Sequence, residues 1–251
     1  MDALTQESQA SPSAPSAASA APTPPAELVL DGERLPLREL NAALRGLPAG
    51  ARARVVNPHG RHNLAVGLDT PAHVLVDGPA GYYTGGLGKQ AHVVVAGRVG
   101  QGVAENLMSG SVRVEGSAGQ SLGASAHGGL IVVTGDASLR VGISLKGATI
   151  AVGGDIGRYG AFLAQAGTIL VGGDAGADLG DSLYEAVIYV AGSIASLGTD
   201  ARVEELTADD VAAVRSLCAT AGFDHIDPEN VTKVTSAREL YHFTTHHATS
   251  Y

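Results

Sequence analysis

The chain of 251 residues contains no tryptophan, one cysteine and three phenylalanines. The single cysteine, Cys218, excludes an internal disulfide framework and a cysteine-ligated iron–sulfur cluster, and it is typical of a reducing cytoplasm. Positive charge is also scarce, because 16 Lys and Arg stand against 25 Asp and Glu, for a formal net charge of −9. Nucleic acid requires a basic surface, which this composition disfavours. We therefore expect a cytoplasmic protein that binds no nucleic acid.

Long apolar runs are absent as well. No stretch approaches the ~20 residues that cross a bilayer, so we expect no membrane association. Residues 1–26 are mostly Ala, Ser and Pro, without the basic region and the leucine-rich core of a secretory signal. This composition predicts a disordered tail.

Glycine is abundant, with 34 residues, and it recurs at a fixed interval. Seven glycines lie 19 residues apart, namely Gly78, Gly97, Gly116, Gly135, Gly154, Gly173 and Gly192. A valine stands two residues before each of them, at Val76, Val95, Val114, Val133, Val152, Val171 and Val190. Two residues earlier there is a further β-branched residue in every row, from Val74 to Ile188. A fixed period near 20 residues is typical of a solenoid.

The chemistry of each repeat indicates which solenoid this is. Alternating β-branched residues predict a strand with one buried face. The glycine that follows each strand suits a corner where φ is positive or backbones stack closely. A 19-residue coil is too short to hold a helix as well as strands, so successive copies must pair in parallel. We expect an all-β core, a right-handed parallel β-helix of about seven coils over residues 70–200, about 30–35 Å long.

The segments that flank the repeat are expected to cap the stack, because bare end strands invite aggregation. In residues 27–69, a strand-like stretch precedes leucines at helical spacing over 37–45. In residues 201–251, Thr207 begins a capping box, a helix over 208–221 follows, and Gly222 ends it. The tail of this last segment is expected to be a short strand or an ordered extension.

One column of the expected strands points outward yet is mostly apolar. We call it the outward ladder; its members are Leu75, Val94, Arg113, Val132, Ala151, Leu170 and Tyr189. A soluble protein rarely leaves such an apolar stripe exposed to solvent. We expect the terminal helices to cover the ends of the ladder and a partner protein to cover the middle rungs, Val94 and Val132. The predicted interface comprises Leu75, Val94, Val132, Leu170 and Tyr189.

Two glycine-rich stretches resemble nucleotide-binding loops only in part. GGLGKQ (85–90) lacks the first glycine of a phosphate loop, since Tyr83 stands there, and it has Gln90 where Ser or Thr is required. GGDIGRYG (153–160) resembles a dinucleotide finger, but its glycines belong to the repeat and no helix is expected after it. Neither stretch predicts a cofactor site.

Isolated reactive side chains are also weak candidates. His127 shares a coil position with residues of surface character, and no carboxylate or nucleophile is placed beside it by the sequence. His242, His246 and His247 form a tail cluster without the cysteines or spaced carboxylates of a metal site. Cys218 lies on the apolar side of its helix and is expected to be a buried small hydrophobe. We therefore predict no catalytic, cofactor-binding or metal-binding residue in this chain.

The 19-residue coils resemble the GXGXG β-helix domain of the glutamate synthase large subunit, which recurs in one of the subunits of formylmethanofuran dehydrogenase. Several segments are similar to the stand-alone GXGXG subunit of N-methylglutamate synthase (methylamine–glutamate N-methyltransferase). They are VVNPHGRHNLAVGLD (55–69), GVAENLMSG (102–110), SLGASAHGG (121–129), GAFLAQAG (160–167), LGDSLYEAVIYVAGSIASLG (179–198) and SARELYHF (236–243). The resemblance covers roughly residues 35–251.

The resemblance implies a division of labour. In such systems a class II amidotransferase-like subunit and an FMN-binding glutamate-synthase-like subunit, which also carries an iron–sulfur cluster, are joined by the β-helix. The chain would then be a non-catalytic subunit, most similar to that of N-methylglutamate synthase, without a cofactor of its own. Two alternatives stay open: a subunit of a formylmethanofuran-dehydrogenase-type formyl-transfer complex, and a stand-alone protein-binding β-solenoid.

Overall fold

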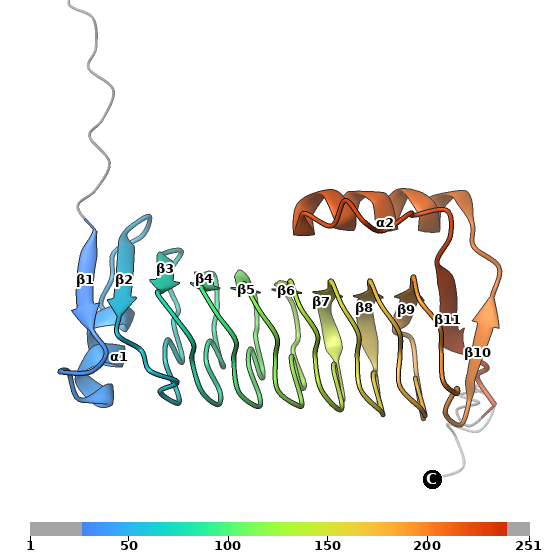
Figure 1. Ribbon diagram of the computed structural model, residues 1–251, viewed down its shortest axis with the longest axis horizontal. Helices are drawn as coiled ribbons and strands as arrows, with labels where there is room; N and C mark the ends of the chain where they lie inside the picture. Colours follow the sequence, from blue (N-terminus) through green and yellow to red (C-terminus); the bar gives the residue numbers. More distant parts are fainter. Residues whose placement is uncertain (1–26, 240–251) are drawn as a thin grey trace, which may run out of the picture.

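The computed structural model describes residues 27–239 and shows a β-solenoid of about seven regular turns (Figure 1). Its elements are β1 (Leu28–Asp31), α1 (Leu37–Arg45), β2 (Arg52–Val56), β3 (His73–Val76), β4 (His92–Val95), β5 (Ser111–Val114), β6 (Leu130–Val133), β7 (Lys146–Val152), β8 (Ala166–Val171), β9 (Val187–Val190), β10 (Ala201–Glu204), α2 (Ala208–Ala221) and β11 (Thr232–Ser236). All eleven strands form one sheet in the order β1 to β9, then β11 and β10. The expected β-helix is therefore confirmed.

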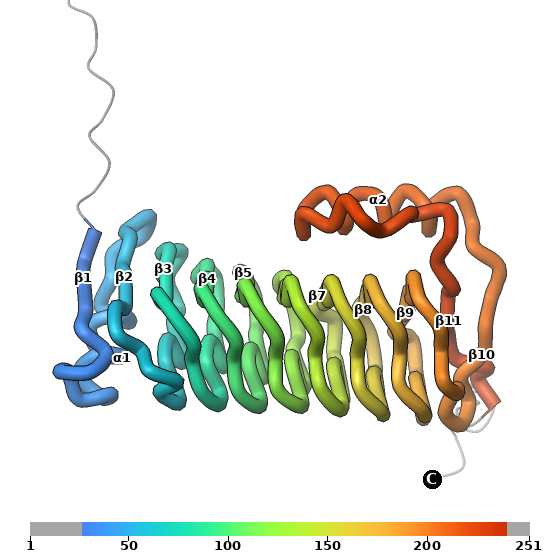
Figure 2. Tube along the Cα trace, viewed as in Figure 1, coloured from blue at the N-terminus to red at the C-terminus, as the bar shows by residue number. Residues whose placement is uncertain are grey.

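The 19-residue period becomes the register of the sheet. From β3 to β9 neighbouring strands are parallel, and residues pair with those 19 positions later, as Val74 does with Val93; the exception is Lys146, which pairs with Ala166 at a register shift between β7 and β8. Both β-branched columns point inward, and Val114 and Val133 are fully buried. Figure 2 shows the resulting row of stacked coils. A second line of parallel bridges follows one corner of the coil, beginning with Val99 and Ala118.

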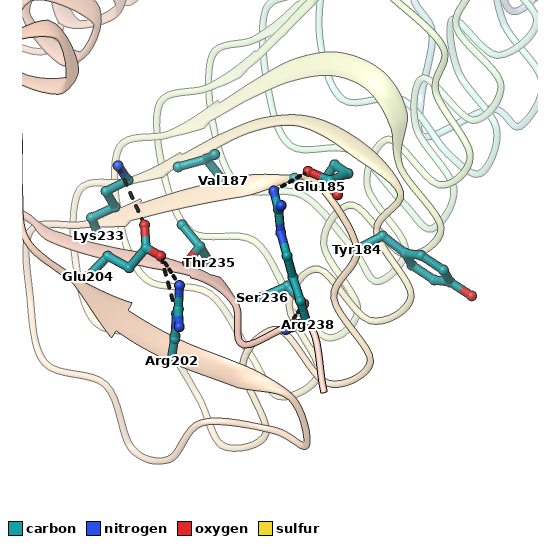
Figure 3. Close-up of a pocket in the computed structure, with 10 residues that line it drawn as sticks. Tyr184, Glu185, Val187, Arg202, Glu204, Lys233, Thr235, Ser236 and Arg238 are labelled. Carbon is teal, nitrogen blue, oxygen red and sulfur yellow. Dashed lines mark hydrogen bonds and ion pairs between the residues drawn. The ribbon is translucent and has the colours of Figure 1, made fainter. Parts of the chain in front are cut away.

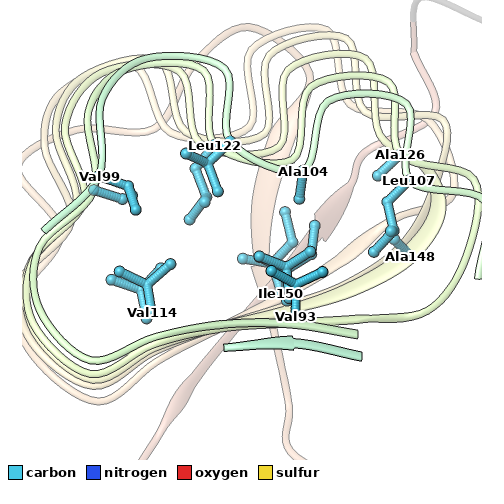
Figure 4. Close-up of a cluster of buried hydrophobic side chains, with 14 of the residues drawn as sticks. Val93, Val99, Ala104, Leu107, Val114, Leu122, Ala126, Ala148 and Ile150 are labelled. Atoms are coloured by element: carbon cyan, nitrogen blue, oxygen red, sulfur yellow. The ribbon is translucent and has the colours of Figure 1, made fainter. Parts of the chain in front are cut away.

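Each coil has two opposite sides with the core between them (Figure 4). On the strand side, the side chains of Val93, Val114 and Ile150 point inward. On the turn side, Ala104 and Leu122 point back toward them, and both are fully buried. The core is therefore one narrow column of small branched side chains along the whole stack.

The turn side has a backbone conformation that the repeat pattern does not reveal. Every second residue there lies in the left-handed region, with φ between 53° and 71°. In successive coils these are residues 83, 85 and 87; 102, 104 and 106; 121, 123 and 125; 140, 142 and 144; 159, 161 and 163; and 178, 180 and 182. Hydrogen bonds to both neighbouring coils stabilise this path. For example, the Tyr83 N–H donates to Gln101 O (2.8 Å) and the Gly85 N–H donates to Leu64 O (2.9 Å).

The seven corner glycines follow the strands as expected, and the structure gives the reason. Of the seven, only Gly78 has a φ in the left-handed region, at 138°. The other six are required by close approach. A Cβ on Gly116 would lie 2.9 Å from the Arg98 nitrogen and 3.0 Å from the Gly97 carbonyl carbon. Close stacking of coils, rather than positive φ, selects glycine in this column.

The two ends of the stack are closed in different ways. At the N-terminal end, β1 and β2 continue the parallel sheet, and α1 packs on it through Leu40 and Leu44, which are buried. At the C-terminal end, β11 pairs antiparallel with β9 and with β10. The helix α2 begins at this end but then runs back along the strand side of the coils (Figure 1).

Candidate partner-binding surfaces

The helix α2 covers four of the seven rungs of the outward ladder. Val132, Ala151, Leu170 and Tyr189 are at most 5% exposed. They form a second apolar cluster together with Val214, Cys218, Ala221, Phe223, Ile226 and Val231. The expectation that Val132, Leu170 and Tyr189 meet a partner is therefore corrected, because the chain's own C-terminal segment occupies these rungs.

The local sequence explains why α2 can take this position. The Thr207 hydroxyl and the Asp210 carboxylate form the expected capping box. Val214, Cys218 and Ala221 lie on one face of the helix at spacings of four and three residues, and all three are buried. Gly222 ends the helix in a left-handed conformation at φ 75°. Cys218 packs in the apolar cluster, and burial raises the pKa of its thiol, which disfavours the reactive thiolate.

A buried polar network fixes the start of α2 to the sheet. The Tyr189 hydroxyl donates to Asp210 Oδ1 (2.6 Å), and Lys233 Nζ donates to Asp210 Oδ2 (2.9 Å). Burial tends to raise the pKa of Asp210, but hydrogen bonds from Thr207, Tyr189 and Lys233 outweigh it and hold that pKa well below its usual range. Burial and the Asp210 carboxylate raise the pKa of Tyr189. Neither group is poised to exchange a proton near neutral pH, so the network is structural.

The other three rungs of the outward ladder are not buried by α2. Leu75, Val94 and Arg113 are partly exposed on adjacent strands β3, β4 and β5, where they pair in register. Arg113 marks the boundary, because its Nη1 donates to the Ala221 carbonyl at the end of α2 (2.8 Å). Beside them, the exposed rings of His73 and His92 stack with centroids 5.0 Å apart. We call these five residues the bare strip.

A cavity of about 420 Å³ lies at the C-terminal end of the stack (Figure 3). Its three cations are already paired: Arg202 with Glu204, Arg238 with Glu185, and Lys233 with Glu204 and Asp210. The remaining lining residues are Tyr184 and Ala186 before β9, Val187 of β9, and Thr235 and Ser236 of β11. These ion pairs join the last strands to one another. The charged side chains of the cavity are therefore structural contacts and do not form a cluster of free reactive groups.

The structure also shows where the two glycine-rich stretches and the candidate histidines lie. GGLGKQ lies on the turn side and leads into β4 without a helix, and Lys89 pairs with Asp69 (3.3 Å). In GGDIGRYG, Gly153 leaves room for the Phe223 ring that follows α2. His127 is exposed. His242, His246 and His247 lie outside the described residues; within 27–239 no three His, Cys, Asp or Glu side chains are grouped to hold a metal.

Sequence reasoning missed an apolar patch on the turn side. Tyr82, Tyr83, Leu87 and Met108 are each 42–59% exposed and lie in two adjacent coils. A cavity of about 210 Å³ adjoins Tyr83 and Leu87. The signal was present in the sequence, because the residues equivalent to Leu87 in the next three coils are Asn106, Ser125 and Ser144.

Comparison with known proteins gives one relative of nearly full length. Protein GlxC of Rhizobium meliloti (strain 1021) is 49% identical over 226 residues, which span 89% of this chain and 99% of that protein. No protein-family model matches the sequence. In the part of the chain that the structure describes, neither helix has the length and apolar character to cross a membrane.

Proposed function

Because the chain belongs to the GlxC family of glutamate-synthase-related GXGXG proteins, we propose that it is a non-catalytic structural subunit of a glutamate-synthase-like complex. The complex is of the N-methylglutamate synthase type and transfers an amine between glutamate and methylamine or ammonia. In it, the chain bridges a class II amidotransferase-like subunit and an FMN-binding synthase-like subunit. FMN and an iron–sulfur cluster reside in the latter.

The observation that carries this proposal is the family relationship over 99% of the relative's length. The structure supports it in two ways. Cys218 is buried in packing, and Asp210 and Arg202 are engaged in ion pairs. The stack also leaves the bare strip exposed beside α2. A partner bound there would continue the apolar contact that α2 makes with the later rungs of the ladder.

A single substitution tests the bare strip as an interface. Val94→Asp places a carboxylate on a partly exposed outward position opposite Arg113, so the coil should fold normally. Binding to one of the two partner subunits should weaken about tenfold or more, since an apolar contact is replaced by a desolvated charge. Val203→Asp, on the 58% exposed Val203 of β10, is the matched control. Both variants and the wild type are co-expressed with the two subunits and purified through a tag on this chain.

The results separate the alternatives. Recovery of both subunits with Val94→Asp at wild-type yield would remove the bare strip from the interface. Recovery of a metallohydrolase-like and a formyltransferase-like subunit in place of the amidotransferase-like and FMN-binding ones would favour the formyl-transfer alternative. The isolated chain should show neither flavin absorbance nor turnover of glutamine, glutamate or methylamine, and a flavin spectrum from it would contradict the division of labour.

A further inference from the structure

The apolar patch on the turn side is not accounted for by the packing of the chain. Tyr82, Tyr83, Leu87 and Met108 form it, and we call them the turn-side patch. Their exposed fractions are 49%, 42%, 59% and 47%. The Met108 N–H donates to the Gly88 carbonyl (2.8 Å), which places Met108 in the coil next to Leu87. Half of the exposed large apolar side chains in residues 27–239 are gathered here.

Leu87 is an unfavourable residue for its own fold. It has φ 55°, in the left-handed region where a branched apolar side chain is disfavoured and Asn or Asp is tolerated. The next three coils carry Asn106, Ser125 and Ser144 at this position, with φ between 53° and 54°, and the fourth carries Leu163 at φ 55°, which is less exposed than Leu87. Leu87 gains little from burial in return, since it is the most exposed large apolar residue of the described chain. Burial within the chain therefore offsets the backbone strain at Leu87 less than it does at Leu163.

The adjoining cavity holds a carboxylate without a cation. Glu105 lines the cavity of about 210 Å³ together with Val66, Tyr83 and Leu87. Within residues 27–239 no lysine, arginine or histidine forms an ion pair with Glu105. Glu105 is partly buried, and the resulting desolvation raises the pKa of its carboxyl group. Lys89 is engaged with Asp69 (3.3 Å), and Arg45 donates to the Val66 carbonyl (3.3 Å).

We propose that the turn-side patch and its cavity are a docking site for a protein segment that inserts an apolar side chain between Tyr83 and Leu87 and sets a Lys or Arg against Glu105. Exposed aromatic and aliphatic anchors around a small cavity are typical of interface hot spots. The unpaired carboxylate specifies the sign of the charge that the partner must bring. The occupant is therefore a basic, apolar-tipped segment of another protein.

The position of the patch gives it a role in the proposed complex. The turn side lies across the core from the strand side (Figure 4), so the patch and the bare strip face in opposite directions. Two proteins can then be held at once without competing for one surface. The identity of the occupant, one of the two partner subunits, rests on the proposed function; the site and its chemistry rest on the residues above.

The decisive variant is one that should fold at least as well as the wild type. Leu87→Asn installs the residue that Asn106 provides in the next coil, so the melting temperature should stay the same or rise. The dissociation constant for one partner subunit should rise about tenfold to a hundredfold, as expected when a buried leucine contact is lost. Glu105→Gln should raise it about fivefold and make it less sensitive to salt. The matched control is Leu139→Asn, since Leu139 is 40% exposed in a coil beyond the patch.

Affinities are measured with the full chain and each co-purified subunit by titration calorimetry, and the oligomeric state of the free chain by analytical ultracentrifugation. If the wild type binds and Leu87→Asn and Glu105→Gln bind equally well, the docking site is wrong and the proposed function stands. If the wild type binds neither subunit, the result overturns both the docking site and the proposed function. If the free wild type is a dimer that Leu87→Asn makes monomeric, a second copy occupies the patch and the assignment to another protein is overturned.

Discussion

Gly116→Ala tests the physical basis of the repeat. The added Cβ would lie 2.9 Å from the Arg98 nitrogen and 3.0 Å from the Gly97 carbonyl carbon, both of which are backbone atoms of the preceding coil. Real Cβ contacts are about 3.4 Å or longer. The two coils must therefore separate by several tenths of an ångström at this corner. The preceding coil has little freedom to move, because its backbone is hydrogen-bonded on both sides: Arg98 O accepts from the Ala80 N–H (3.1 Å), and the Val99 N–H donates to Ser117 O (2.9 Å).

The expected cost follows from this geometry. Overpacking a rigid interior by one methyl group costs about 1–3 kcal/mol. For a chain of this size, 1 kcal/mol lowers the melting temperature by about 2–4 °C, so a cost near 2 kcal/mol corresponds to about 4–8 °C. Gly116→Val should be worse, because its two γ-methyl groups meet the same backbone.

The assay is differential scanning calorimetry with a matched glycine. Gly46 ends α1 at φ −81°, and a Cβ there would lie 3.5 Å from its nearest neighbours, an ordinary contact. Gly46→Ala should therefore change the melting temperature by no more than about 2 °C. If Gly116→Ala melts together with Gly46→Ala, close stacking of the coils is not what selects glycine in the corner column.

Three further predictions concern α2 and its contacts. Val132→Asp should release α2 and make it sensitive to trypsin, since a carboxylate would be buried in the apolar cluster, whereas Val94→Asp should not; equal protection of both variants would contradict the division of the ladder. The lowered pKa of Asp210 gives stability that is present above its unfolded pKa of about 4 and is lost as pH falls toward the folded value. In an acid titration followed by circular dichroism, Asp210→Asn should therefore lose less stability than the wild type as the pH falls. An unchanged pH dependence would mean that the Asp210 network does not help to hold α2 on the sheet. Cys218 should react with a thiol reagent far more slowly in the native protein than in urea, because it is 7% exposed and its pKa is raised; equal rates would mean that α2 opens freely.

The strands of the solenoid were predictable from sequence because one physical constraint repeats in every coil. An inward β-branched residue at Val114 must stack on its equivalents at Val95 and Val133, so sequence period and structural register coincide. The helix bounds 37–45 and 208–221 were predictable from local signals such as the Thr207 capping box. The turn side was not predictable in this way. Tyr83 and Leu87 occupy left-handed positions that local propensity argues against, and only the neighbouring coils hold the backbone there.

The path of α2 was not deduced, yet helix and sheet geometry constrain it. A helix of 14 residues is about 21 Å long at 1.5 Å per residue, and strands stack about 4.8 Å apart, so α2 spans about four rungs. Val132, Ala151, Leu170 and Tyr189 are the last four rungs of the outward ladder, and all are apolar or aromatic.

The next rung is Arg113, the one charged member of the ladder, and it lies where the helix ends. The last turn of α2 contains no basic residue of its own, and Arg113 Nη1 supplies the positive charge to the Ala221 carbonyl. A cation at this end is favoured because the last carbonyls of a helix carry partial negative charge. The break in the apolar ladder thus coincides with the end of α2, where Gly222 terminates the helix. Beyond Arg113, no element of residues 27–239 covers Val94 and Leu75 as α2 covers the later rungs. For this reason we assign the bare strip to a partner.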